Sequence, residues 1–387
     1  MIIIRNNQHF FLKMIFQEVY KNITKKQIIK LTYHLIMQTF GELTKNHIIV
    51  KKQKNSGRLI SKSHLGKLNS KGDVKLDLLE GVFLLGENKI RIFKNKKELY
   101  FQELVTFTAK KISEFEIIYL IFKDLRSRGL AVKCCNKNEL TTFYIHKQKK
   151  DINEKEKFIL AFSERDFFDL KKTSCLIKDL TKKNGELWYA IVDEEGDITY
   201  YHVSNQDLKG EVSEKRYSKG KGILLKNRIV LFDDKLSNEL FKNEFYGKPF
   251  GSGLQLSLVE GMYLIEKKEI DIKSISGEKL SDIQCKEYII NLQPDIASRL
   301  MVFSDLKKRG LIIKTGYKFG THFRVYTKQP DKTHAEYLVH VVDKDFTSIW
   351  AEMSRAVRLA HSVNKEILFA RVDGKKIEYI KFGRLRP

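Results

Sequence analysis

FKDLRSRGLAVK at residues 122–133 returns as FSDLKKRGLIIK at residues 303–314. The offset is about 180 residues, whereas the repeats of solenoid proteins have periods of about 20–50 residues. The same offset relates two further pairs: EGVFL at 80–84 with EGMYL at 260–264, and Val192-Asp193 with Val372-Asp373. The sequence therefore indicates a duplicated domain, in which one copy is free to lose its chemistry.

The duplication divides the chain into five parts. Residues 1–45 precede the repeat and are expected to form a helical extension, because their apolar residues recur at helical spacing. The first copy spans 46–204, and a polar linker of mixed charge spans 205–221. The second copy divides into an N-terminal subdomain at 222–297 and a C-terminal subdomain at 298–387.

Each copy has the pattern of a mixed α/β (α+β) fold. Residues 113–128 form an amphipathic pattern that stops at Gly129, and residues 298–308 repeat it before Gly310. Short apolar runs typical of strands follow each helix, and a further helix lies between them. Each copy is therefore predicted to have an N-terminal αβ subdomain and a C-terminal mixed sheet flanked by helices.

The charge of the chain favours a polyanionic partner. There are 72 Lys and Arg against 48 Asp and Glu, which gives a formal net charge of +24. Nucleic acid is the simplest partner for such a surface. The competing explanation is a general bias toward lysine, which outnumbers arginine heavily in this chain.

The cysteines and the apolar runs favour a cytoplasmic protein. The four cysteines form no CxxC pair, and adjacent cysteines at 134 and 135 make a poor disulfide. This usage is typical of a reducing compartment and predicts no structural zinc. No apolar run approaches 18 residues, so no membrane partner is expected.

The most informative stretches lie in the second copy. They are KTGYKFGTHFRVYTKQPDKTHAEYLVHVV at 314–342 and RAVRLAHSVNKEILFARVD at 355–373. Together they resemble the archaeal tRNA-splicing endonucleases, of the type that carries two repeats in one chain. The resemblance covers about residues 46–387 and is strongest over 299–382.

The resemblance implies three catalytic residues. Tyr326, the last residue of FRVY, would be the general base, His334 the general acid, and Lys365 the cation that stabilises the transition state. RNA can be cut without a metal ion or cofactor when its own 2′-OH attacks the adjacent phosphate. Because a free tyrosine gives up its proton only near pH 10, the role of Tyr326 requires nearby positive charge, which Lys365 and its basic surroundings would provide. The products would be a 2′,3′-cyclic phosphate and a 5′-OH.

The first copy lacks the same three side chains. At the repeat offset His146 stands opposite Tyr326 and Gly185 opposite Lys365, and residues 154–156 offer no histidine. The first copy is therefore predicted to be structural.

The resemblance also implies a homodimer and an RNA-binding pair. An acidic loop of the silent copy, expected at 204–214 with Asp207 and Glu211, would dock into a basic pocket of the partner. Without the resemblance this loop would be interpreted as a solvated linker. Arg358 and Arg384 would hold an extruded RNA base between them, since guanidinium groups stack on bases. Taken alone, they would be a helix-surface cation and a residue of a frayed tail.

The leading hypothesis is thus a metal-independent endonuclease that removes introns from precursor tRNA at a bulge-helix-bulge structure. One alternative is a metal-dependent structure-specific nuclease, which would need clustered carboxylates. The carboxylates near the proposed site form no D…ExK arrangement; they are Asp331, Glu336, Glu366 and Asp373. The other alternative is a non-catalytic RNA-binding subunit, which the intact trio argues against.

Overall fold

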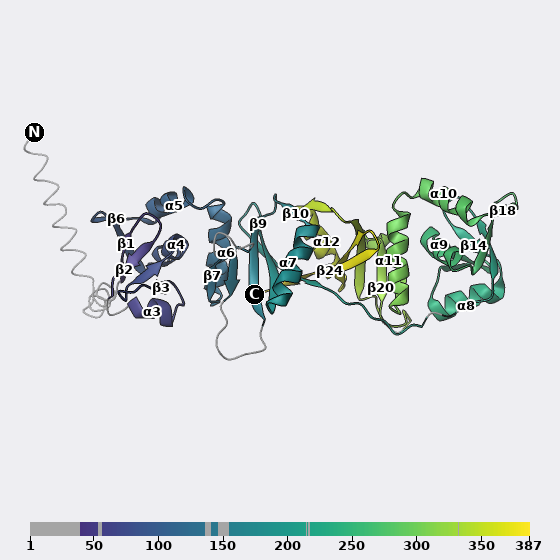
Figure 1. The fold of residues 1–387 in the computed structure, drawn as a ribbon, viewed down its shortest axis with the longest axis horizontal. Coiled ribbons are helices and arrows are strands. Elements are labelled where there is room, and N and C mark those ends of the chain that lie inside the picture. The colour runs from purple at the N-terminus through teal and green to yellow at the C-terminus, as the bar shows by residue number, and fades with distance from the viewer. Residues whose placement is uncertain are drawn as a thin grey trace, which may run out of the picture. The chain divides into compact units, whose positions relative to one another are not determined.

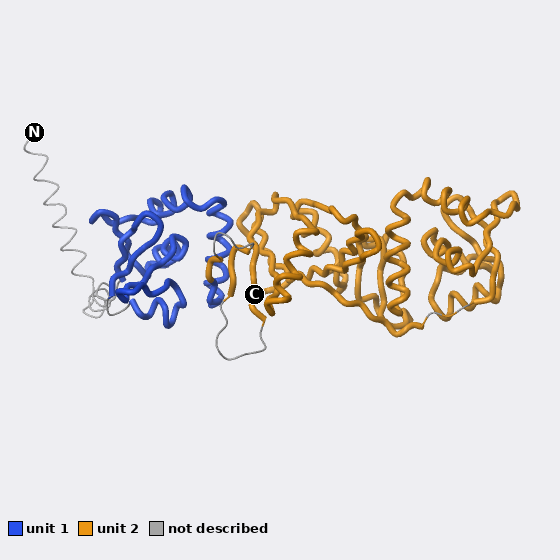
Figure 2. The backbone as a smooth tube through the Cα atoms, viewed as in Figure 1, with its two compact units in different colours: residues 1–132 blue, residues 133–387 orange. Residues whose placement is uncertain are grey.

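The computed structural model describes residues 39–52, 56–135, 141–145, 155–213, 215, 217–331 and 333–387. The chain forms two compact units, Met1–Val132 and Lys133–Pro387 (Figure 2). The fold is mixed α/β, and its repeated domains confirm the duplication expected from the sequence.

Unit 1 is built on a six-stranded mixed sheet in the order β3-β4-β2-β1-β5-β6. Helix α4 packs closely on it, since a Cβ atom on Gly81 would lie 1.9 Å from Cδ1 of Ile48. The strands are β1 (Thr39–Leu43), β2 (Ile48–Val50), β3 (Lys67–Leu68), β4 (Val74–Leu76), β5 (Ile90–Lys94) and β6 (Lys97–Leu99). The helices are α3 (Ser56–Ser61), α4 (Leu78–Gly86), α5 (Phe101–Ala109) and α6 (Phe115–Ser127).

The first copy begins earlier than expected. Strand β1 lies within the 1–45 segment that was expected to be helical, and it pairs in parallel with β5. Thr39, Gly41 and Leu43 are buried and alternate with exposed residues, which is the period of a strand with one buried face. The expectation for residues 1–38 lies outside the described residues.

The second copy, which lies within unit 2, begins with a sheet of the same design as that of unit 1. The order β15-β16-β14-β13-β17-β18 matches that of unit 1 strand for strand. Gly261 of α9 lies against Ile229 as Gly81 lies against Ile48. The elements are β13 (Gly220–Leu224), β14 (Ile229–Leu231), α8 (Asp234–Glu244), β15 (Lys248–Phe250), β16 (Gly253–Leu256), α9 (Leu258–Glu266), β17 (Ile270–Lys273), β18 (Lys279–Leu280) and α10 (Asp282–Leu292).

The C-terminal parts of both copies share one ten-stranded sheet in the order β19-β20-β21-β23-β24-β12-β11-β9-β8-β7. The strands of the first copy are β7 (Val132–Cys134), β8 (Phe143–Ile145), β9 (Glu156–Ser163), β11 (Gly185–Val192) and β12 (Ile198–Asn205). Those of the second are β19 (Ile312–Thr315), β20 (Phe323–Tyr326), β21 (Tyr337–Asp343), β23 (Glu366–Asp373) and β24 (Lys376–Leu385). The copies meet where β12 pairs antiparallel with β24.

Aromatic packing stabilises the junction between the two copies. Helices α7 (Leu170–Lys182) and α12 (Trp350–Ser362) cover one face of the sheet (Figure 1). The ring of Trp350 lies 4.9 Å from that of Tyr189 and 5.1 Å from that of Phe168. Short strands β10 (Phe167–Asp169) and β22 (Thr347–Ile349) pair beside it. The first copy is thus part of the core on which α12 rests.

A buried ion pair fixes the second N-terminal subdomain on helix α11 (Ile296–Lys308). The Nζ atom of Lys307 lies 2.7 Å from a carboxylate oxygen of Glu244, and both side chains are 3% exposed. The same ammonium group lies 4.6 Å from the centre of the Tyr246 ring. Loss of either partner would be strongly destabilising, because it would leave an uncompensated charge buried between the subdomain and α11.

Candidate active site

The expected catalytic segments meet at one edge of the ten-stranded sheet. Strand β20 ends at this edge with Tyr326, and strands β21 and β23 begin at the same edge. The pairing of Val325 with Tyr337, and of Tyr337 with Glu366, places these three strand ends side by side. Residues 326, 334 and 365 are therefore delivered to a common edge by three neighbouring strands.

Tyr326 is held firmly. It is 8% exposed and packs with Ile312, which lies opposite it on β19, and with Ala335. The guanidinium carbon of Arg324, two residues earlier on the same strand face, lies 5.9 Å from the centre of the Tyr326 ring. The edge thus carries a buried phenol beside a guanidinium group.

His334 lies on the segment that leads into β21. Its side chain is exposed. Two residues later the amide of Glu336 donates to the carbonyl of Val325 at 3.1 Å, which holds the segment against β20. His334 is thus accessible to a substrate and stands near the end of the strand that carries Tyr326.

Lys365 is delivered by the turn after α12. Asn364 adopts a left-handed conformation with φ of 54°, which asparagine tolerates better than most residues. The Lys365 amide donates to the Ala360 carbonyl at 3.0 Å. Its ammonium group donates to the Val363 carbonyl at 3.2 Å and lies 5.6 Å from the centre of the Phe319 ring. These contacts fix the position of the ammonium group.

The first copy has the same turn without the lysine. Asn184 has φ of 55°, almost equal to that of Asn364. The next residue is Gly185, where a Cβ atom would lie 2.8 Å from the ring of Phe158. An aromatic side chain therefore fills the space beside this position. His146, which stands opposite Tyr326 in the sequence, lies outside the described residues.

Arg358 and Arg384 both lie near Tyr201. Arg384 lies opposite Tyr201 in the pairing of β24 with β12, and both arginines are exposed. Burial raises the pKa of Tyr201, and the charges of the two arginines act in the opposite direction. Since Phe382 pairs with Ile367, Arg384 stands at the same sheet edge as Lys365.

Asp207 and Glu211 contact the second copy of their own chain. The Asp207 carboxylate lies 2.9 Å from a guanidinium nitrogen of Arg309 although its side chain is 94% exposed. Glu211 lies 4.0 Å from the ammonium group of Lys328. Their contact with a partner chain stays a prediction.

Two other histidines of the second copy have different surroundings from His334. The rings of His322 and His340 stack at 4.7 Å. His322 accepts a hydrogen bond from the amide of Val341 at 2.8 Å. Burial lowers the pKa of His322 to about 4. His322 is therefore a neutral acceptor within the fold.

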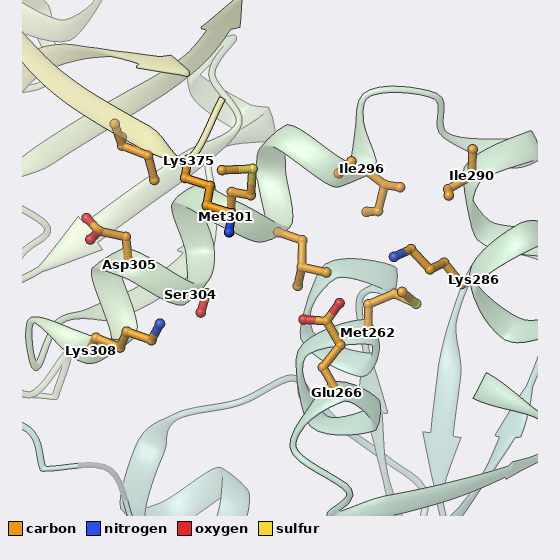
Figure 3. Close-up of a pocket in the computed structure, with 13 residues that line it drawn as sticks. Met262, Glu266, Lys286, Ile290, Ile296, Met301, Ser304, Asp305, Lys308 and Lys375 are labelled. Carbon is orange, nitrogen blue, oxygen red and sulfur yellow. The ribbon is translucent and has the colours of Figure 1, made fainter. Parts of the chain in front are cut away.

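A cleft separate from this edge lies between α9, α10 and α11 of unit 2. Its volume is about 430 Å³. Lys286, Lys308 and Lys375 line it together with Glu266 and Asp305 (Figure 3). The lysines outnumber the carboxylates, so the cleft suits an acidic group.

Two residues of the site were not singled out from the sequence. Arg324 and Phe319 stand beside Tyr326 and Lys365 respectively. The position of Arg324 two residues before Tyr326 on one strand was a usable signal. Phe319 lies in the short helical turn η1 (Tyr317–Phe319), and its contact with a residue so far along the chain had no sequence signal.

Two features are absent from the part of the chain that the structure describes. They contain no group of three or more His, Cys, Asp or Glu side chains placed to hold a metal ion. Within the same residues, every helix is too short or too polar to cross a membrane.

Comparison with known families agrees with this architecture. The family model of the tRNA intron endonuclease catalytic C-terminal domain matches residues 296–379. The model of the tRNA intron endonuclease N-terminal domain matches twice, at 39–105 and 220–284. The chain belongs to the tRNA intron endonuclease family.

Several curated relatives carry the name tRNA-splicing endonuclease. The tRNA-splicing endonuclease of Methanococcoides burtonii is 34% identical over 354 residues, which is 89% of this chain and 99% of the relative. That of Methanosarcina mazei is 31% identical over 320 residues, 81% of this chain and 90% of the relative. That of Methanopyrus kandleri is 37% identical over 145 residues, 37% of this chain and 81% of the relative.

Proposed function

We propose that this tRNA intron endonuclease excises introns from precursor tRNA by cutting at a bulge-helix-bulge structure, without a metal ion. The observation that carries the proposal is the meeting of three strand ends at one sheet edge. Tyr326, His334 and Lys365 stand in the chain at or within a few residues of these strand ends. Recognition of RNA by shape and by unpaired bases suits a basic surface, and the chain has a net charge of +24.

The proposed reaction needs only groups of the RNA and of this chain. Tyr326 takes the proton of the 2′-OH, and the 2′-oxygen forms a bond to the adjacent phosphorus. The bond from phosphorus to the 5′-oxygen breaks, and His334 gives that oxygen a proton. Lys365 stabilises the additional negative charge on the phosphate oxygens. The RNA is left with a 2′,3′-cyclic phosphate and a 5′-OH.

Three of the four carboxylates of the competing metal-dependent hypothesis are engaged in other contacts. Glu336 accepts a hydrogen bond from the Thr327 hydroxyl at 2.5 Å. Glu366 pairs with Lys381 at 3.1 Å, and Asp373 pairs with Arg371 at 3.2 Å. These pairings favour the metal-free proposal over a site that uses the carboxylates as ligands.

The proposed RNA contacts extend from the trio along the same edge. Arg358 and Arg384 are exposed and adjacent to Tyr201. Two exposed guanidinium groups that both lie near one tyrosine suit an extruded base stacked between them. The base would then hold the phosphate next to it near Lys365.

Substrate shape is the test of this function. A precursor tRNA with a bulge-helix-bulge at the intron boundaries should be cut at both boundaries. The same RNA with its bulges closed by complementary nucleotides should be cut at least about 100-fold more slowly, because paired and stacked bases cannot be splayed out. Equal rates on the two RNAs, measured on denaturing gels, would contradict recognition of the bulges.

We further propose that the enzyme is a homodimer, in which Asp207 and Glu211 of one chain face the lysine-lined cleft of the other. The cleft carries Lys286, Lys308 and Lys375, so its charge complements the loop. The same-chain pairs of both carboxylates are exposed and contribute only about 0–1 kcal/mol each, so they leave the side chains available.

The dimer proposal predicts a change in self-association. Asp207→Asn together with Glu211→Gln should raise the dimer dissociation constant at least about tenfold in analytical ultracentrifugation, because the proposed contact is between charges. The chain should stay folded by circular dichroism. A matched control is Asp193→Asn with Glu195→Gln in an exposed turn of the silent copy. An unchanged dissociation constant for the Asp207 and Glu211 variant would show that the loop is not the docking element.

A further inference from the structure

The linker that leaves the silent copy is folded onto the working copy of the same chain. We call residues 207–212 the strap. Three backbone amides of the strap donate to carbonyls at the end of α11 and just after β20: Gly210 to Arg309 at 2.9 Å, Val212 to Gly310 at 3.0 Å and Glu211 to Thr327 at 3.2 Å. Leu208 is 3% exposed and belongs to the core of the second copy. The strap is therefore a packed element.

Two glycines permit the strap to lie this close. A Cβ atom on Gly210 would stand 2.1 Å from the carbonyl oxygen of Gly310 and 3.0 Å from the Cα atom of Leu311. Both neighbours are backbone atoms, which cannot turn away as a flexible side chain would. Gly310 has φ of 77°, so its own position also requires glycine. Any side chain at 210 would push the strap off the working copy.

The strap ends beside the proposed general base. Val212 packs against the small cluster formed by Tyr326, Ile312 and Ala335. Glu211 donates to the carbonyl of Thr327, the residue that follows Tyr326. The cluster that contains Tyr326 is thus packed against Val212, which comes from a segment that belongs to neither of the neighbouring strands.

We infer that the strap is a positioning element for Tyr326, through which the silent copy sets the geometry of the working site within one chain. The inference rests on the proposed function, because it assigns the strap to a residue of that reaction. A displacement of a reacting group by about 1 Å can cost about 100-fold in rate. A displaced strap should therefore slow the chemical step while leaving RNA binding intact.

The test replaces Gly210 in the full-length chain. Gly210→Ala should lower the single-turnover rate on intron-containing precursor tRNA by about 10- to 100-fold, with the dissociation constant for that RNA unchanged. Protein concentrations are chosen at which the dimer persists. Gly57→Ala is the matched control, because a Cβ atom there has no neighbour within 4 Å, and its rate should equal that of the parent chain.

A double substitution distinguishes positioning from general loss of structure. In a Tyr326→Phe background, Gly210→Ala should cause less than about a twofold further loss, because the group that the strap positions is already absent. Equal losses in the two backgrounds, or no loss in either, would overturn the inference. If Tyr326→Phe alone leaves the rate unchanged, the proposed role of Tyr326 fails instead.

A smaller substitution, at Val212, tests the same inference with less disturbance of the fold. Val212→Ala should lower the rate several-fold with the same dependence on Tyr326, whereas Val212→Ile, which keeps the β-branched contact, should stay near the parent rate. A loss for both variants that is independent of Tyr326 would also overturn the inference.

Discussion

Lys365→Ala should lower the single-turnover rate of precursor cleavage by about 100- to 1,000-fold, which is the usual cost of removing one preorganised stabiliser of a developing charge. The reason is the fixed placement of the ammonium group, which is held by the Val363 carbonyl and the Phe319 ring. The dissociation constant for the RNA should change little, because the role belongs to the transition state. Rates are measured with enzyme in excess over labelled precursor.

The first copy supplies the control for this substitution. Lys183 is exposed in the corresponding turn, one residue before Asn184, and Lys183→Ala should leave the rate within about twofold of the parent, as expected for an exposed surface change. A large loss for Lys183→Ala would place chemistry in the first copy. A loss of less than about threefold for Lys365→Ala would remove Lys365 from the proposed mechanism.

His334→Ala should lower the rate by about 100- to 10,000-fold, the range of general acid catalysis. The loss should nearly vanish on an RNA whose scissile 5′-oxygen is replaced by sulfur. A thiolate leaves without needing a proton, so the acid becomes dispensable for that substrate. The rescue separates proton donation from any structural role of the side chain.

His361 provides a matched histidine for this experiment. It is exposed on α12, near Lys365 in the sequence, and His361→Ala should change neither rate by more than about twofold, since exposed side chains away from the chemistry tolerate truncation. If the sulfur substrate is cut as poorly as the normal RNA by the His334→Ala enzyme, His334 does not act as the acid.

The sequence predicted the repeated part of the fold well because duplication is visible without three-dimensional information. Both helix stops were confirmed, at Gly129 with φ of 85° and at Gly310 with φ of 77°. The start of the first copy was placed too late. Strand β1 has only five residues, which alternate between buried and exposed. Such a short alternation predicts a strand less strongly than the apolar pattern before it in the sequence predicts a helix.

Contacts between segments that are distant along the chain could not be predicted from the sequence. The strap was interpreted as a polar linker, since its composition is that of a loop, and its role depends on Gly210 meeting Gly310 about 100 residues later in the chain. The joining of both copies into one sheet likewise depends on the pairing of β12 with β24. By contrast, Tyr326, His334 and Lys365 lie at strand ends that local patterns already suggested.

The most direct test of the central claim is to incubate the purified chain with an intron-containing precursor tRNA in excess EDTA and to determine the new RNA ends. The account predicts cleavage at the rate seen without EDTA, with a 2′,3′-cyclic phosphate on one side of each cut and a 5′-OH on the other. Cleavage that EDTA abolishes, or products that carry a 3′-OH, would contradict it.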